Sequence, residues 1–434
     1  MARMAVLVVA SVLVGTAGVG TAQTTSDLAR ENAELRSRVE NLEKQVGLLP
    51  AESSEPSKEK KSLWSSLDVQ FYGYIKGDAA YDTSRTTTGN FVVWTDSEAA
   101  KDNDDEFNLT ANETRLGLAI SGPKNGRIET SGRVEFDLYG NAAAENKAAF
   151  QMRHAYLNIL WPESRFSILG GQTWDVISPL NPSTLNYTVL WDAGNIGYRR
   201  PQIRLTKDVA VDAKTTLQVV GAVTRTIGRD SAVAGVNSES GEDAGFPTFQ
   251  GRIGLTFPWL TAGPTNVGVS GHWGQEEYDV DATGRHKDFD TWSANLHMAQ
   301  PVNEWISLKG ELFYGENLNT FFGGIGQGVR VNTNAAKTVV TAANEIASKG
   351  GWCAATIKAC DPLTFNVGIG IDDVDADDVN AGSRTLNRSI FGNVIYAVNK
   401  HADVGFELSH WRTDYRGNGD ADNVRFQTSL KYKF

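Results

Sequence analysis

Arginines that alternate with apolar residues are the side chains of this sequence best suited to bind a ligand. In the segment GYRRPQIRLTKD, Arg200 and Arg204 alternate with Ile203 and Leu205. Successive side chains of a strand face opposite sides, so both arginines lie on the hydrophilic face. A guanidinium group stays charged at working pH and matches a carboxylate with two parallel hydrogen bonds. We therefore predict an anion-binding wall. Its residues are Arg115, Arg133, Arg200, Arg204 and Arg252, with Tyr198 beside them.

A second interpretation of these arginines stays open. They can pair with acids of the same face and stiffen the wall without selecting anions. The candidate acids are Glu113, Glu129, Glu135 and Asp137. Arg153 is a separate case, because it follows the parity of Leu157 and Ile159 and reaches the hydrophilic face only through a bulge or at a strand's rim.

A long apolar connection, WDVISPLNPSTLNYTVLWDAGNIG at 174–197, precedes Arg200. It is too long and too apolar for a solvated loop. We expect it to fold into the interior of a barrel and narrow the passage beside Arg200 and Arg204. The residues predicted to form this constriction are Trp174, Asp175, Tyr187 and Trp191. The alternative is a loop that packs over the centre of an oligomer.

Other chemistry finds little support in the sequence. Six histidines are scattered without metal-ligand spacing. The glycine-rich FFGGIGQG has no lysine and no strand-to-helix context for a phosphate, and DDVDADD lacks the glycine and glutamate of a calcium loop. We predict no enzyme activity, no cofactor, no metal and no nucleic-acid partner. Cys353 and Cys360 are predicted to form a disulfide, the alternative being two unpaired thiols.

The elements that would carry these side chains are strands with one apolar and one charged face. LDVQFYGYIKG at 67–77 sets Val69, Phe71 and Ile75 against Gln70 and Lys76. Short turns alternate with longer polar connections along the chain, and their number indicates about sixteen strands. The weakest strand spans 345–358. Charges on the second face exclude a second core, so the pattern is typical of a transmembrane barrel over 67–434, large enough for an aqueous channel.

The last predicted strand, NVRFQTSLKYKF, closes the barrel in this interpretation. Phe426, Leu430 and Phe434 lie on its apolar face, and lysines and Arg425 lie on the other. Every backbone group at such an edge must be paired in lipid. Phe434 is also the predicted contact for the barrel-assembly machinery.

The first 66 residues differ from the rest of the chain in composition and in the pattern of their apolar residues. Residues 1–22 read as a secretory signal peptide, with Arg3, a short apolar run and small residues before Gln23. Residues 23–50 carry an apolar heptad repeat and predict a coiled coil in the periplasm. Its core positions, which we expect to hold the subunits together, are Leu28, Asn32, Leu35, Val39, Leu42 and Val46. Residues 51–66, rich in Ser, Lys and Glu, read as a flexible linker.

Several motifs together resemble those of the DcaP-like porins. They are FYGYIKGDAAYD, MRHAYLNI, LGGQTWD, YRRPQIRL, GGIGQG and GIGIDD, in this order. The resemblance covers essentially the whole mature chain, including the predicted helix. It implies a homotrimer of sixteen-stranded channels in the outer membrane of Gram-negative bacteria, with an N-terminal periplasmic coiled coil. It also implies passage of small anions, dicarboxylates in particular.

The composition does not by itself favour an anion channel. The net charge is −11, with 41 basic against 52 acidic residues, but runs of acids fall on the predicted long loops. Those loops would meet lipopolysaccharide at the membrane surface. We predict a diffusion channel that prefers small anionic solutes. The alternatives are a structural tether with an incidental pore and a phosphate-specific porin, for which lysines would suit better.

Overall fold

The computed structural model describes residues 67–99, 104–123, 126–140, 147–228, 233, 241–260 and 263–434. The predicted signal peptide, coiled coil and linker lie outside these residues. So do all six core positions of the predicted coiled coil: Leu28, Asn32, Leu35, Val39, Leu42 and Val46.

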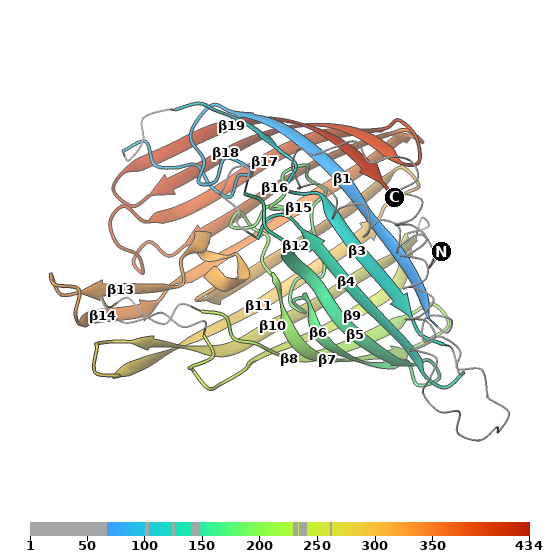
Figure 1. Ribbon diagram of the computed structural model, residues 1–434, viewed down its shortest axis with the longest axis horizontal. Helices are drawn as coiled ribbons and strands as arrows, with labels where there is room; N and C mark the ends of the chain where they lie inside the picture. Colours follow the sequence, from blue (N-terminus) through green and yellow to red (C-terminus); the bar gives the residue numbers. More distant parts are fainter. Residues whose placement is uncertain are drawn as a thin grey trace, which may run out of the picture. The chain divides into compact units, whose positions relative to one another are not determined.

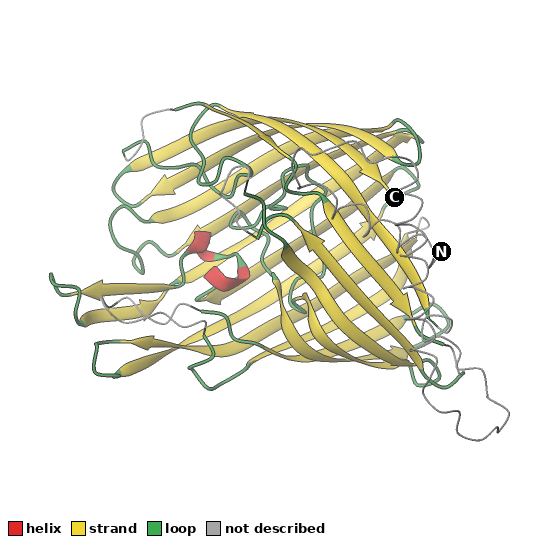
Figure 2. Cartoon of the chain, viewed as in Figure 1, coloured by secondary structure: helices red, strands yellow, loops and turns green. Residues whose placement is uncertain are grey.

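The described chain folds into one closed antiparallel β-barrel (Figures 1 and 2). The first strand, β1 (Asp68–Asp82), pairs with the last, β19 (Gly419–Lys433), and closes the sheet. Figure 1 shows these two strands side by side, blue against red. The other strands of the wall are β2 (Glu106–Thr110), β3 (Arg115–Ser121), β4 (Glu129–Asp137), β5 (Gln151–Trp161), β6 (Phe166–Trp174), β7 (Arg199–Ala210), β8 (Thr216–Thr224), β9 (Thr248–Leu260), β10 (Gly263–Asp279), β11 (His286–Pro301), β12 (Ile306–Glu316), β15 (Ala347–Cys360), β16 (Leu363–Val374), β17 (Arg384–Ala397) and β18 (Ala402–Tyr415).

The predicted number of strands is confirmed. The sheet has 17 strands, but β2 and β3 both pair with β1 and share one place, so the wall has sixteen positions. The weak strand predicted at 345–358 is β15. Short turns alternate with longer connections along the chain, as expected. Both kinds of connection join strands that are neighbours in the sheet.

The longest connection contains structure that the sequence did not predict. Between β12 and β15 lie two short 3-10 helices, η2 (Asn319–Phe321) and η3 (Gly324–Gly326). A separate hairpin follows, formed by β13 (Val329–Thr333) and β14 (Val340–Glu345), and it projects from one end of the barrel (Figure 1).

The two faces of the wall differ in polarity as the alternation requires. On β19, Phe426 and Leu430 point outward and are 52% and 63% exposed, whereas Arg425 and Gln427 point inward and are buried. The same rule holds on β7, where Ile203 is outward and Arg204 inward. Among the residues that the structure describes, no helix is long and apolar enough to cross a membrane. The apolar face surrounds the barrel, and the polar face lines its interior.

The predicted disulfide is wrong. Cys353 and Cys360 are both free and exposed, and both lie on β15. Seven residue steps along an extended strand separate them by about 23 Å, whereas a disulfide requires Cα atoms within about 7 Å. The predicted strand at 345–358 contained Cys353 but ended before Cys360, whereas β15 continues through Cys360, so the chain does not turn between the two residues.

Candidate functional site

The interior of the barrel is crossed by residues 175–198, which connect β6 to β7. Their main chain binds wall carboxylates and amides from far around the barrel. The amide of Val176 donates to Gln250 on β9 at 2.6 Å, and that of Leu180 donates to Glu311 on β12 at 3.0 Å. The amide of Leu185 donates to Glu407 on β18 at 2.6 Å. We call this segment the interior loop. Polar wall side chains hold it in place because it has few internal backbone bonds of its own.

The interior loop lies directly on the wall at Gly194. This residue has a φ of +110°, and a Cβ there would lie 2.1 Å from the carbonyl oxygen of Gly351 on β15. The wall also lacks a side chain at the contact on β16, where a Cβ at Gly370 would lie 2.1 Å from the carbonyl oxygen of Ala193. Glycine therefore permits a backbone-to-backbone contact that a side chain would block.

The interior loop also contacts the turn that contains η2 and η3. The amide of Asp192 donates to Phe322 O at 2.9 Å, and that of Gly197 donates to Phe321 O at 2.6 Å. The carboxylate of Asp192 accepts from the amide of Gly326 at 2.8 Å. Burial raises the pKa of Asp192 to about 7. Two segments distant in the sequence thus form one partition inside the barrel.

Arg200 lies inside the barrel but does not face open space. It is 1% exposed, and its Nε lies 2.8 Å from Asp175 at the start of the interior loop. Its guanidinium group also stacks 3.7 Å from the ring centre of Phe321 and donates to Thr320 O. This placement differs from the predicted one, in which Arg200 lines the passage. Arg200 joins β7 to the interior loop.

Arg153 reaches the interior through a bulge. The register of β4 and β5 shifts between Glu135 and Phe136, which turns Arg153 inward despite its parity. Its guanidinium group binds Glu135 at 2.7 Å and Asp137 at 2.9 Å. The bulge that the sequence left open is therefore present. Arg153 is buried and paired, so it stabilises the wall.

Arg204 and Arg252 are different, because they have no acidic partner. Arg204 donates to Gln202 at 2.9 Å and to the carbonyl oxygen of Trp174, and Arg252 donates to Gln218 at 2.7 Å. Both are half-buried on the inner face. Within the described residues, neither has a carboxylate within 4.0 Å. The two cations repel each other and interact with Asp175, Glu311 and Asp208 only at longer range, so this part of the wall carries positive charge that no direct ion pair neutralises.

A second group of cations lies where β19, β1, β3 and β4 meet. Arg133 lies over the ring of Tyr72 at 5.4 Å, and Lys431 lies over Tyr74 at 4.6 Å. In the described part of the chain, neither has a carboxylate within ion-pair distance. Arg115 is intermediate: it also stacks on Tyr74, and its Nε lies 3.6 Å from Glu135.

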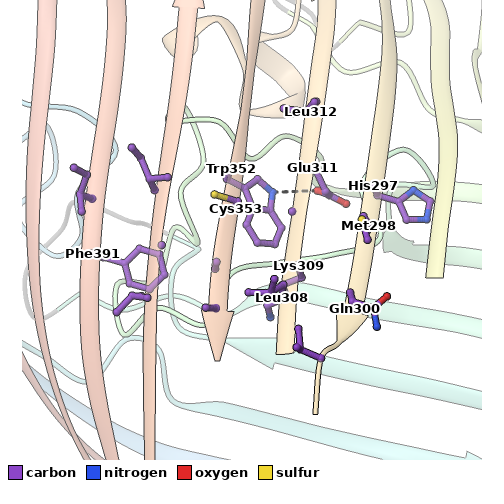
Figure 3. A pocket seen from close by; sticks show the side chains of 18 of the residues that line it. His297, Met298, Gln300, Leu308, Lys309, Glu311, Leu312, Trp352, Cys353 and Phe391 are labelled. Atoms are coloured by element: carbon purple, nitrogen blue, oxygen red, sulfur yellow. Dashed lines mark hydrogen bonds between the residues drawn. The ribbon is translucent and has the colours of Figure 1, made fainter. Parts of the chain in front are cut away.

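Lys309 on β12 is an interior cation that our sequence analysis missed. Its Nζ donates to Ser183 of the interior loop at 3.2 Å, and it is half-buried. Figure 3 shows it on the strand that also carries Glu311, which accepts a hydrogen bond from the indole of Trp352 at 3.3 Å. Lys309 directly follows the outward-facing Leu308 on the strand, and this alternation would have predicted that Lys309 faces inward.

The acids of the interior are engaged with protein groups. Asp82 binds Arg425 at 2.7 Å, and Glu113 binds Lys76. Other carboxylates accept from main-chain amides of the interior loop and its neighbouring turn, as at Glu311, Glu407 and Asp192. For the described residues, the cations that remain open on the inner face are Arg133, Arg204, Arg252, Lys309 and Lys431.

The aromatic residues predicted for the constriction lie together in one cluster. Trp191 stacks on Phe322 at 4.5 Å, and Tyr198 packs against the same ring at 4.8 Å. Trp174 lies 6.2 Å from Trp191. The hydroxyl of Tyr187 donates to Asp137 at 3.0 Å and thereby ties the cluster to β4.

A hollow of about 1340 Å³ runs along the wall from the end of β9 to β18 (Figure 3). Its lining includes the exposed residues Leu296, Leu308 and Ile369. The lining also includes the inward-facing Lys309 and Glu311, so the hollow reaches the polar side of β12 as well. No group of three or more His, Cys, Asp or Glu residues in the described part is arranged to hold a metal ion.

Comparison with known proteins agrees with this architecture. The family described as DcaP outer membrane protein matches residues 24–248. The outer membrane channel DcaP of Acinetobacter baumannii has a similar structure, with 19% identity, a TM-score of 0.66, and coverage of 88% of this chain and 100% of that one. No curated protein matches the chain in sequence.

Two further solved structures share the fold at lower similarity. An anion-selective porin from Comamonas acidovorans has 12% identity and a TM-score of 0.51, with coverage of 85% of this chain and 100% of that one. The trimer form of in-vitro folded OmpT from Vibrio cholerae has 11% identity and a TM-score of 0.51, with the same coverage. The family match spans more than half of the chain, so the chain belongs to the DcaP outer membrane protein family. It is an outer-membrane β-barrel of the porin type.

Proposed function

We propose that this member of the DcaP family is a diffusion channel that prefers small anions, dicarboxylates in particular. One observation carries the proposal. Five partly exposed cations of the inner face form no ion pair with the described residues: Arg133, Arg204, Arg252, Lys309 and Lys431. The interior acids, in contrast, bind cations, amides or hydroxyl groups. A mobile anion therefore meets positive charge along the wall, despite the net charge of −11 for the whole chain.

The position of the cations suits a ligand with two charged ends. They come from β4, β7, β9, β12 and β19, so they are distributed around the wall. Arg204 and Arg252 form one positive region, and Arg133 and Lys431 belong to another. A dicarboxylate can contact two regions in turn, and weak binding at each allows it to leave. In this proposal Trp174 at the end of β6 and the interior loop, with Asp175, Tyr187 and Trp191, form the constriction.

The assembly around the channel is part of the proposal. Residues 1–22 direct export, and residues 23–50 form a periplasmic coiled coil that holds a homotrimer, joined to the barrel by residues 51–66. One structural neighbour, in-vitro folded OmpT of Vibrio cholerae, is known in a trimer form. The outer apolar face contacts membrane lipid, and the long loops contact lipopolysaccharide. The barrel-assembly machinery recognises the strand that carries Phe434.

The test is the zero-current potential of the purified protein in a planar bilayer under a potassium chloride gradient. The wild type is expected to show anion preference, and added succinate is expected to reduce the current. Arg204→Gln and Arg252→Gln should each weaken the preference and the succinate block about threefold or more, because each removes an open charge. Arg388→Gln is the matched control, since Arg388 is exposed on the outer side of β17.

Three results would contradict parts of the proposal. Cation preference without succinate block would mean that the acidic loops govern entry to a general porin. A barrel without conductance would favour the structural tether. Stronger block by phosphate than by succinate would favour a phosphate-specific porin, an alternative to which Lys309 and Lys431 contribute as point charges.

A further inference from the structure

Arg199 is a buried cation without a counter-ion. It is 2% exposed, yet none of its three guanidinium nitrogens has a hydrogen-bond acceptor among the described residues. Aromatic rings surround it: the guanidinium carbon lies 4.8 Å from the ring centres of Trp174 and Tyr198 and 5.8 Å from that of Trp191. Rings of this kind attract a cation but accept no strong hydrogen bond.

The other deeply buried cations of the described barrel show what Arg199 lacks. Lys76 binds Asp78 and Glu113, Arg200 binds Asp175, and Arg425 binds Asp82. Arg153 binds two acids. A buried charge without a partner costs several kcal/mol, on the order found when one member of a buried pair is removed. Each of these four buried cations has an acidic partner, and Arg199 has none among the described residues.

A second donor without a partner lies in the same cluster. The indole Nε1 of Trp191 is buried and has no acceptor among the described residues, and Trp191 is 3% exposed. Arg199 and Trp191 both donate and neither accepts. Two neighbouring donors without acceptors indicate a ligand rich in lone pairs, because native proteins rarely leave such groups unsatisfied.

The charges that face Arg199 do not supply this acceptor. The hydroxyl of Tyr187 faces the guanidinium group and donates its single hydrogen to Asp137 or Gln151. Its oxygen is neutral, so it does not compensate the charge of Arg199 or serve all three nitrogens. His154 on β5 also faces Arg199, and it faces Arg153 and Arg133 as well. Glu135 and Asp137 also face this cluster, but Arg153 is paired with both of them, so the charge of Arg199 stays without a counter-ion and favours an anion.

We propose that Arg199 and the indole N–H of Trp191 together hold a small anion, a halide or one carboxylate of a solute, at the interior loop. The enclosure of both donors limits the occupant to a small group. This inference deepens the proposed function and rests on it, because the same solutes reach the site through the channel. Arg199 anchors the anion, and Trp191 orients it with one hydrogen bond.

The experiment uses the full-length protein and bromide as the probe. Crystals soaked in sodium bromide are measured at the bromine absorption edge. We expect an anomalous peak within hydrogen-bonding distance of the Arg199 guanidinium group and Trp191 Nε1. In solution, bromide should raise the thermal unfolding midpoint relative to gluconate, which is too large for the site. Addition of succinate distinguishes the sources, since a solute carboxylate that uses the site displaces bromide and a purely structural halide is retained.

Two variants make the result specific. Trp191→Phe keeps the ring and removes the N–H donor, and it should weaken bromide binding about tenfold, as expected for one hydrogen bond to a charged acceptor. Trp305→Phe, at an exposed tryptophan outside the strands, is the matched control and should leave binding unchanged. Arg199→Met should abolish the peak, and if this variant fails to fold, Trp191→Phe still decides.

Absence of bromide at Arg199, or equal binding by Trp191→Phe and Trp305→Phe, would overturn the proposal. The two proposals fail separately. An anion-selective channel with no bromide at this position refutes only the Arg199 site. Bromide at this position in a channel without anion preference refutes only the proposed function.

Discussion

At the scale of single residues, the interior charges fall into two groups that differ in what they contact. Arg153, Arg200 and Arg425 are buried against carboxylates, so removing one of them leaves a buried acid alone. Arg204 and Arg252 bind only neutral oxygens of the described residues and keep their charge available. Both groups carry the same guanidinium group. Their roles differ because their neighbours differ.

Arg153→Met is therefore predicted to lower stability. The variant leaves Asp137 buried without a cation and leaves Glu135 with Arg115 alone, at 3.6 Å, which costs about 3–5 kcal/mol. The measurement is unfolding of the barrel in urea from lipid vesicles. Arg388→Met, at an exposed outer position, is the control and should change stability by less than about 0.5 kcal/mol. Equal midpoints for the two variants would show that the acids find other partners.

At the scale of elements, the strands were predictable and the contacts between distant segments were not. Alternation of Phe71, Ile75 and their polar neighbours depends only on local sequence, so the wall and its sixteen positions followed from it. The hairpin β13–β14 did not, because it lies outside the sheet of the barrel and is too short for a clear alternation. Its contact with the rest of the chain is also not local, as in the hydrogen bond from Val340 N to Val280 O at 2.8 Å.

The interior site was also only partly predictable from the sequence. Parity alone places Arg204 and Arg252 on the inner face, and it does the same for Arg200. It cannot show that Asp175 pairs with Arg200, nor that aromatic rings from β6 and the interior loop enclose Arg199. Those facts depend on how a loop folds back, which periodicity does not encode.

The contact between the interior loop and the neighbouring turn should depend on pH through Asp192. Its ordinary pKa of 3.8 rises to about 7 in the folded protein, because burial disfavours the charged form. The stability from the protonated group is therefore complete below about pH 4 and is lost as the pH rises through about 7. Arg384 and Asp372 also face this carboxyl group and act on it in opposite directions.

Asp192→Asn tests this dependence without altering the backbone. Asparagine tolerates the left-handed conformation of Asp192, whose φ is 58°. The measurement is hydrogen exchange at the amides of Asp192 and Gly197, corrected for the intrinsic effect of pH. Protection in the wild type should fall about tenfold or more from pH 5 to pH 8, while protection in the variant should stay level. A variant that keeps the wild-type dependence would assign it to another group.

At the scale of the whole molecule, the barrel depends on one seam between the first and last strands. β1 and β19 pair from Tyr74–Lys433 to Asp82–Arg425. Beyond this ladder, Gly73 and Phe434 exchange two backbone hydrogen bonds of 3.1 Å. The ring of Phe434 stacks on Phe71 at 5.2 Å on the outer face. In lipid an unpaired edge costs several kcal/mol per group, so the seam must be complete.

Phe434→Ala is predicted to slow assembly while leaving the backbone pairs intact. The ring contributes packing to the seam and, in our proposal, recognition by the barrel-assembly machinery. The measurement is the yield of heat-modifiable barrel in lipid vesicles, with and without that machinery. Tyr432→Ala is the matched control, because Tyr432 is an exposed aromatic residue on the same face of β19. Recognition predicts that the defect of Phe434→Ala appears mainly with the machinery present and exceeds that of Tyr432→Ala severalfold. An equal defect in both reactions would reduce the role of Phe434 to its contact with Phe71.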